Sequence, residues 1–188
     1  LEELEEQGII KLPAKRETQK RTYLPSKIET QQEPEFHTSL EEIGPIVLER
    51  VMTSADREEY QDYIRKYHYL GFKQAIGQQI AYFIVAENSK RKLGCILFSG
   101  SATYSLAARD VWIGWNENQR KKLLPLVLRN NRFLIFPWVY VPHLASKALS
   151  MVTSRVAAVW LQTYGYQPVL IETFVDNEKY TGTSYQAA

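Results

Sequence analysis

The sequence lacks three features that would each have indicated a class of protein. Its 188 residues include a single cysteine, Cys95, which excludes an internal disulfide and with it a small secreted scaffold held together by disulfides. No stretch approaches the roughly 18 consecutive apolar residues of a transmembrane helix, so we expect no membrane partner. The first residues do not form a signal peptide, and we therefore expect a cytoplasmic location.

A large excess of charge of one sign is also missing. The 23 Lys and Arg residues nearly balance 21 Asp and Glu residues, for a formal charge of +2. Proteins that bind nucleic-acid backbones usually carry a clear positive excess on one face, so the position of the basic residues matters more than their number. Hydrophobic residues make up 45% of the chain and aromatic residues 12%, enough for one compact domain with a substantial core.

Composition divides the chain into three parts. Residues 1–13 are typical of a helix end closed by glycine and a short strand, as at the end of a winged-helix-like segment. Residues 14–38 are polar and are predicted to form a linker or arm, and residues 39–188 the main domain. Because the chain starts at Leu1 without methionine, we expect it to be a segment of a longer protein.

The arm carries a modest basic run: Lys15, Arg16, Lys20 and Arg21. Two interpretations remain open for it, a solvated linker and an arm that contacts phosphates. In the second interpretation Arg16, Lys20 and Arg21 bind nucleic acid.

Hydrophobic periodicity predicts an α+β fold in the main domain. The predicted strands are residues 45–51, 79–87, 92–98, 108–115, 132–136 and 168–175. The predicted helices are one capped by Ser54, one over 116–130 interrupted at Pro125, and one over 142–164 ended by Gly165. This order predicts a mixed β-sheet flanked by helices. The same order occurs in the GNAT acetyltransferase fold, although topology alone carries no function.

A histidine between two tyrosines follows the first of these helices, in Tyr67-His68-Tyr69-Leu70-Gly71-Phe72. Histidine can act as an acid or base near neutral pH, and tyrosine rings can stack on bases. His68 is therefore a candidate catalytic residue. The alternative is a helix end whose aromatic residues pack on the core.

An acidic residue accompanies two tryptophans in Ala108-Arg109-Asp110-Val111-Trp112-Ile113-Gly114-Trp115. In a strand, Asp110 and Arg109 point to opposite faces, so we expect no side-by-side ion pair between them. Asp110 either is buried against a donor or lines a cleft. It is a candidate catalytic residue, and Arg109 a candidate nucleic-acid contact.

Polar residues precede the next apolar strand, in Arg129-Asn130-Asn131-Arg132-Phe133. The planar donor fork of arginine suits phosphate or carboxylate, and asparagine can read a base edge. Arg132 is therefore a candidate catalytic residue, and Arg129 and Asn131 are candidate nucleic-acid contacts. A turn formed by the two asparagines is the alternative.

The last predicted strand places Glu172 and Asp176 on one face, about 13 Å apart along the strand at ~3.3 Å per residue. That spacing is too long for a shared proton or one metal ion. Glu172 is a candidate catalytic residue, and a metal site made with Asp110 is a minor alternative, so no metal is predicted and the cofactor is unknown.

Together these clusters resemble the signature of the Druantia protein A family. The resemblance covers nearly the whole chain and rests on Tyr67–Gly71, Arg109-Asp110 with Trp112–Trp115, Asn131–Ile135 with Leu144-Ala145-Ser146, and Glu172–Asp176 with Gly182-Thr183 and Tyr185. The family occurs in the Druantia anti-phage system and beside or fused to transposase-like domains. The resemblance therefore implies a role in defence, with other defence-system subunits as partners, but no particular chemistry.

A more distant resemblance is to GNAT proteins, including a phage-encoded branch that modifies DNA and holds a similar His-Tyr pair. Acetyltransferases usually bind pyrophosphate with a glycine-containing loop at a helix N-terminus. The corresponding junction here, residues 139–147, contains no glycine. The acetyl-coenzyme A signature is therefore absent.

Three functions follow as expectations. The first is an accessory defence subunit that binds nucleic acid, DNA rather than RNA. The second is an enzyme acting on nucleic acid, with a site built from His68, Asp110, Arg132 and Glu172. The third is a scaffold that bridges subunits, and assembly into a homo-oligomer is left open. We expect Asp110, Arg132 and Glu172 to line one cleft.

Overall fold

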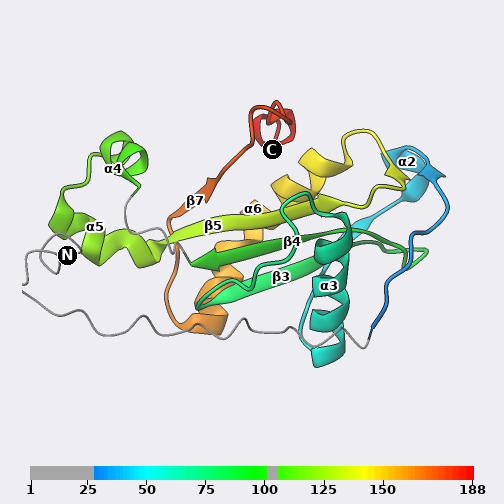
Figure 1. Cartoon of the computed structure of the whole chain (residues 1–188), viewed down its shortest axis with the longest axis horizontal. Coiled ribbons are helices and arrows are strands. Elements are labelled where there is room, and N and C mark those ends of the chain that lie inside the picture. Colours follow the sequence, from blue (N-terminus) through cyan, green and yellow to red (C-terminus); the bar gives the residue numbers. More distant parts are fainter. Residues whose placement is uncertain (1–27, 101–105) are drawn as a thin grey trace, which may run out of the picture.

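The computed structural model describes residues 28–100 and 106–188, and this part of the chain is built on a mixed five-stranded sheet with helices on both faces (Figure 1). The α+β class predicted from the sequence is thereby confirmed. In chain order the elements are β1 Phe36–His37, α2 Leu40–Ile43, β2 Ile46–Arg50, α3 Ser54–Tyr67, β3 Gln79–Ala86, β4 Lys92–Gly100, α4 Ala107–Ile113, α5 Glu117–Leu123, the 3-10 helix η1 Leu124–Leu126, β5 Val127–Ile135, β6 Val139–Tyr140, α6 Leu144–Tyr164, β7 Leu170–Thr173 and α7 Thr183–Gln186.

The strand order of the main sheet is β2-β3-β4-β5-β7. The first four strands are antiparallel to their neighbours, whereas β7 runs parallel to β5 after the crossover through α6. Pairing between β5 and β7 is confined to residues 127–130 and 170–173. Beyond this point the chain after β7 diverges from β5 toward the C-terminus (Figure 1).

A β-bulge interrupts β5 where this divergence begins. Asn130 pairs with Phe98 and Arg132 with Leu97, so Asn131 is the extra residue of β5. The Asn130 amide donates to the backbone oxygens of Leu97, at 3.2 Å, and Arg132, at 3.3 Å. The short Asn130 side chain thus supports the irregular backbone. Because of the extra residue, the Arg132 side chain lies on the face of the sheet where regular alternation would have placed the side chain of Asn131.

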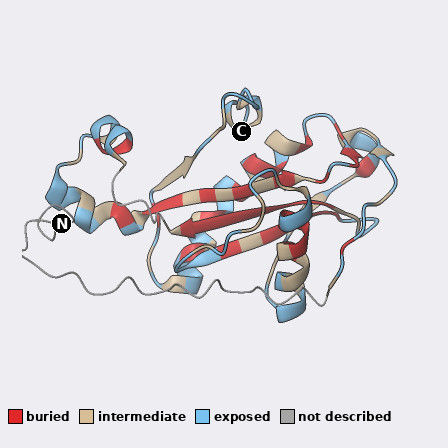
Figure 2. Ribbon diagram, viewed as in Figure 1, coloured by how far each residue is buried: buried red, intermediate tan, exposed pale blue. Residues whose placement is uncertain are grey.

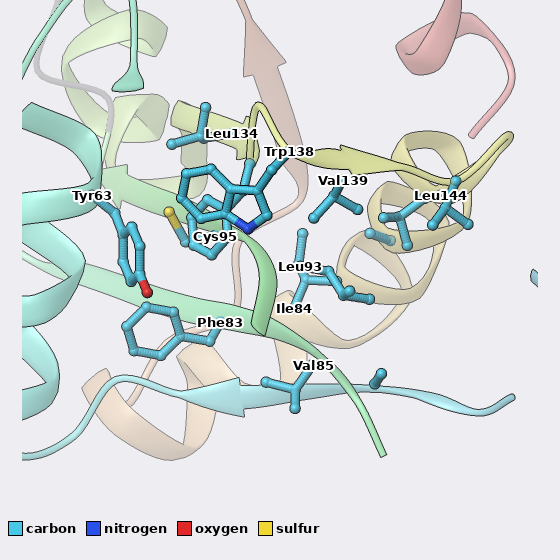
Figure 3. Packing of buried hydrophobic residues seen from close by; sticks show 14 of the residues in the cluster. Tyr63, Phe83, Ile84, Val85, Leu93, Cys95, Leu134, Trp138, Val139 and Leu144 are labelled. Atoms are coloured by element: carbon cyan, nitrogen blue, oxygen red, sulfur yellow. The ribbon is translucent and has the colours of Figure 1, made fainter. Parts of the chain in front are cut away.

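One face of the sheet is covered by α3. Thr53 and Asp56 form a capping box at its start, one residue before the cap predicted from the sequence. Its buried residues Tyr60, Tyr63 and Ile64 belong to the larger core cluster. Figure 3 shows Tyr63 in this cluster beside Phe83, near Cys95 and Trp138. The Cys95 side chain is fully buried in this cluster.

The opposite face is covered by α6, whose residues Leu149, Val152, Val156 and Trp160 pack in the second core cluster. Gly165 ends this helix in the left-handed conformation at φ 81°, as predicted. The two faces of β3 and β4 are therefore both buried, which the burial colours of Figure 2 show along these strands.

The segment between β4 and β5 corrects two predictions. Residues 108–115 are not a strand: α4 occupies Ala107–Ile113, and Gly114 closes it at φ 83°. The predicted helix over 116–130 is α5 and η1 only, and β5 already begins at Val127. Neither short helix has the regular buried face that periodicity detects, and most of α4 and α5 is exposed (Figure 2). The short elements β1, α2, β6 and α7 were not predicted.

Residues 1–27, which include the expected winged-helix-like segment and the basic residues Arg16, Lys20 and Arg21, lie outside the described residues. Within the expected arm, Thr30 is buried, and both its backbone NH and its hydroxyl donate to Asp62 of α3. Among the helices that the structure describes, none has the length and apolar character needed to cross a membrane.

Candidate functional site

The candidate residues from the sequence fall into two neighbouring groups. One is an arginine–carboxylate network of Arg109, Asp110, Arg120, Arg129 and Glu172. The other lines a cavity between β5 and the segment that follows β7, with the loop after α3 as a third wall; we call it the β5–β7 cavity.

The network is a chain of alternating charges. Glu172 accepts from Arg129 through Oε1, at 2.9 Å from Nη2, and from Arg109 through Oε2, at 3.3 Å from Nη1. Arg109 also donates to Asp110 Oδ1 at 2.9 Å, and Asp110 Oδ2 accepts from Arg120 at 3.3 Å. The side chains of Arg109, Asp110 and Glu172 are at most 10% exposed. Such shielded charges need these partners, because an isolated buried ion is strongly unfavourable.

Local geometry explains how the network forms. Arg129 and Glu172 are direct partners in the parallel β5–β7 pairing, so their side chains lie on the same face. Arg109 and Asp110 lie on a helix, where neighbouring side chains are not forced to opposite faces. The expectation that these two residues cannot pair is therefore wrong, because it depended on a strand. Although burial opposes ionisation, hydrogen bonds from Arg109 and Arg120 hold the pKa of Asp110 below its usual range.

The β5–β7 cavity has a volume of about 360 Å³. It exists because β7 stops pairing at Thr173, while β5 continues to Ile135. The far wall is held in place by Tyr185 of α7, whose hydroxyl donates to Asn130 Oδ1 at 2.6 Å. The bulge of β5 and the C-terminal helix are thus tied together at the start of the cavity.

Arg132 lines this cavity and is only 9% exposed. Its Nη1 donates to both oxygens of Asn131, the backbone O at 2.7 Å and Oδ1 at 2.9 Å, and its Nε donates to the Gly71 carbonyl at 3.3 Å. Within residues 28–100 and 106–188, no carboxylate forms an ion pair with Arg132. Among the described residues, the oxygens that accept from this guanidinium are neutral, unlike those around the three arginines of the network.

His68 lines the same cavity from the loop after α3. Its Nδ1 accepts from the backbone NH of Leu70 at 3.2 Å, which leaves the proton of the neutral ring on Nε2. Burial and, to a lesser extent, the positive charge of Arg132 lower the pKa of His68 to about 4. At neutral pH the imidazole is therefore an uncharged donor and a weak base.

Residues 3–188 match the protein family described as Druantia protein DruA. The chain belongs to the DruA family. No curated protein matches it, and no solved structure does. Membership of this family makes the chain a component of Druantia anti-phage defence, as the resemblance of its motifs implied.

In this DruA-family chain, the four candidate catalytic residues are divided between the two groups. His68 and Arg132 line the β5–β7 cavity, whereas Asp110 and Glu172 are joined through Arg109 in the network. Thr173, the neighbour of Glu172, lines the cavity, so the groups meet at the end of β7. Among the candidate nucleic-acid contacts, Asn131 lines the cavity.

The other two described contacts expected from the sequence, Arg109 and Arg129, are engaged by carboxylates in the network. Glu172 and Asp110 likewise accept from arginines, and Arg109 bridges the two carboxylates. No group of three or more metal-ligating side chains occurs in the described part of the chain.

Sequence reasoning identified the Tyr69 loop as a place where tyrosine rings can stack on bases, but it overlooked the other rings of the cavity rim. Tyr69, Leu70, Phe174 and Tyr180 all line it, and they are 42%, 53%, 54% and 51% exposed. Lys179 lies over the Tyr69 ring at 5.0 Å, and the rings of Tyr69 and Tyr180 are 5.4 Å apart. The available signal was the presence of large aromatic residues in an otherwise polar C-terminal segment.

Proposed function

We propose that this DruA-family chain is an accessory subunit of its defence system that binds nucleic acid, DNA rather than RNA. The observation that carries the proposal is the basic character of the segment that protrudes between β4 and β5, residues 107–126. This α4–α5 projection contains four basic and two acidic residues, an excess of two that equals the formal charge of the whole chain. Local concentration of positive charge matters for phosphate binding, and net charge does not.

The projection offers its charge on the surface. Lys121 and Lys122 of α5 are exposed, and Trp112 of α4 is 79% exposed. Lys121 pairs with Glu117 of the same helix at 2.8 Å, a surface ion pair of the kind that contributes little and that a phosphate can replace. Figure 1 shows α4 and α5 extending beyond the end of the main sheet. Arg109 and Arg129 are shielded and engaged with Glu172, so in this proposal they hold the projection and β7 together, and the lysines contact phosphates.

The preference for DNA comes from the resemblance to a family found beside transposase-like domains. The basic residues Arg16, Lys20 and Arg21, which lie outside the described residues, are proposed as further phosphate contacts on the basis of the sequence alone. Family membership also favours other defence subunits as partners, and the exposed Val111 and Trp112 suit a protein contact.

Salt dependence of DNA binding tests the proposal. Each phosphate contact contributes about 0.9 to the slope of log affinity against log salt. We expect Lys121→Ala with Lys122→Ala to weaken duplex binding and to reduce this slope by up to about 2. The matched control is Lys73→Ala with Lys147→Ala, two exposed lysines outside the projection. Binding that is equally affected by both pairs, or by neither, contradicts a phosphate-binding projection.

A second candidate function is an enzyme of GNAT-like fold that acts on nucleic acid. It is favoured by the presence of His68 and Arg132 in one cavity at the point where β7 diverges from β5. The low basicity of His68 and the absence of a glycine loop before α6 weigh against it. In the enzymatic case, His68→Ala abolishes phage protection and leaves DNA affinity unchanged. In the accessory case, protection follows DNA affinity.

A further inference from the structure

The rim of the β5–β7 cavity consists of aromatic residues that the fold leaves exposed. Tyr69 comes from the loop after α3, whereas Phe174 and Tyr180 come from the segment after β7. About half of each side chain faces solvent, although aromatic rings are among the most favourable groups to bury. Cations already lie over two of these rings, Lys179 over Tyr69 at 5.0 Å and Arg129 over Phe174 at 4.7 Å, and His68 stacks on Tyr69 at 4.9 Å. The ring surface that stays exposed comes from two distant parts of the chain and surrounds one opening. Such surfaces suit the faces of nucleobases.

The interior of the cavity has the opposite character. Arg132 is nine-tenths buried there, and its described partners are the uncharged oxygens of Asn131 and Gly71. A cation removed from water is stabilised much more by an anion than by neutral acceptors. Asp176 also lines the cavity, but its described ion pair is with Lys179 at 3.5 Å, so an anionic group of a ligand would complete the environment of Arg132. Phosphate fits the planar guanidinium particularly well.

The cavity also has the size of a small ligand. Its volume of about 360 Å³ lies near the lower end of ligand pockets, which are roughly 300–1,000 Å³. A base pair that remains stacked in a duplex cannot present its face to the aromatic rim, because its neighbours cover both faces. The cavity therefore suits a single nucleotide that has left the stack.

The position of Arg132 is fixed before any ligand arrives. The β-bulge supplies both oxygens of Asn131 that hold Nη1, and Asn130 links the bulge to Tyr185 on the opposite wall. Neutral His68 adds a donor, Nε2–H, without a competing charge. A site whose side chains are held by second contacts loses little entropy on binding.

We propose that the β5–β7 cavity binds one unstacked nucleotide of a DNA strand, with its phosphate at Arg132 and its base against Tyr69, Phe174 and Tyr180. This inference rests on the proposed function, since it names the form of DNA that the chain recognises. The α4–α5 projection then contacts the backbone of duplex or single strand alike, and the cavity favours strand ends, single strands or locally opened duplexes.

Fluorescence anisotropy with a labelled single strand and the matching duplex tests the cavity. We expect Tyr180→Ala to weaken single-strand binding about five- to a hundredfold, the loss of one base–aromatic stack, with an unchanged salt slope and unchanged duplex affinity. The control is Tyr140→Ala, because Tyr140 is 47% exposed and lies outside the cavity lining. Arg132→Gln should weaken single-strand binding and reduce its salt slope by about 0.7. Arg132→Lys, which keeps the charge, should retain the slope.

The outcomes separate the inference from the proposal on which it rests. Wild-type protein that binds neither DNA overturns both. If the protein binds duplex and single strand equally and Tyr180→Ala behaves as the wild type, the nucleotide-binding role of the cavity is overturned, while the proposal of a DNA-binding subunit stands. A free deoxynucleoside monophosphate that competes as well as the strand overturns the assignment to a DNA strand. Thermal melting of each variant shows whether it is folded, and Tyr180→Ala, at an exposed position, keeps the test decisive if Arg132→Gln does not fold.

Discussion

Replacement of Glu172 by Gln tests what the arginine–carboxylate network does. Glutamine keeps the shape of the side chain and one acceptor oxygen, but it removes the negative charge between Arg109 and Arg129 and turns an NH2 group toward donors. The two guanidinium groups then face each other across a neutral residue. Because the Glu172 side chain is 10% exposed, water compensates only partly.

The expected loss of stability follows from these contacts. Hydrogen bonds to a charged group contribute about 1.5–3 kcal/mol, and removing one partner of a buried pair costs about 3–5 kcal/mol. Since glutamine retains part of the hydrogen bonding, we expect Glu172→Gln to lower the free energy of unfolding by about 2–4 kcal/mol. For a chain of this length, that corresponds to a fall in Tm of about 5–15 °C.

Thermal melting and a plaque assay on the same variant distinguish the two roles of Glu172. The matched control is Glu178→Gln, an exposed carboxylate in the segment after β7, which should melt like the wild type. A structural role predicts a lower Tm, with phage protection restored when cells are grown at a lower temperature. An unchanged Tm with lost protection would refute the structural reasoning and return Glu172 to the catalytic candidates. An unchanged Tm with full protection would show that the Glu172 charge contributes neither to stability nor to phage protection.

Three further predictions concern single residues. The pKa of His68 is about 4 against an ordinary 6.5, so folding favours the neutral ring. This preference contributes on the order of 1–2 kcal/mol to stability after allowance for solvent exposure, and the contribution is complete above pH 6.5 and lost as the pH falls through 4. NMR titration of the ring and thermal melting, with His68→Gln as the control, will measure it. Gly94→Ala should destabilise the protein by at least about 1–3 kcal/mol in urea unfolding, because a Cβ would lie 2.3 Å from the Leu134 carbonyl oxygen, whereas Gly100→Ala has open space and should not. Cys95 should not react with a thiol reagent until urea unfolds the chain, because burial raises its pKa; rapid reaction of the native protein would contradict the buried position.

The parts of the fold that the sequence predicted correctly are those with strong and continuous patterns. The β3–β4 hairpin consists of two apolar runs around a polar turn, and both runs are buried on both faces. Helix α6 is long, and its buried residues recur with helical spacing until Gly165 ends it. In these elements local preference and tertiary burial agree, so periodicity alone is sufficient.

Helix α4 shows where that agreement fails. Its residues Val111, Trp112 and Ile113 are of the β-branched and aromatic types that are typical of strands, yet Val111 and Trp112 are both about 80% exposed and no apolar face is buried. Tertiary ion pairs hold the helix instead, through Arg109, to a carboxylate 63 positions away. A window of sequence contains no information on such a partner.

The candidate site was predictable as a set of residue types and not as an arrangement. His68, Arg132 and Asn131 were selected for their chemistry and do line one cavity. The bulge that exchanges the faces of Asn131 and Arg132 depends on register with β4, which the sequence of β5 alone does not specify. Arg132 and Glu172 were correctly placed in one sheet, but the sequence did not show that Arg132 lines the cavity while Glu172 belongs to the network, because this too depends on strand register.

The network and the cavity meet at the last paired residues of β5 and β7, and this position gives the network a consequence for binding. Glu172 holds β7 to β5 through Arg129 one residue before Thr173, the first residue of β7 that lines the cavity. Two anchors, this ion pair and the Tyr185–Asn130 hydrogen bond, thus fix the angle at which the C-terminal wall leaves the sheet. Loss of the Glu172 charge should therefore weaken single-strand binding even at temperatures where Glu172→Gln is fully folded. Duplex binding should fall less, because Lys121 and Lys122 keep their charges although Arg109 loses its partner in β7. If both affinities stay at the wild-type value, the cavity keeps its shape without the network, and the Tyr185–Asn130 contact is sufficient to define it.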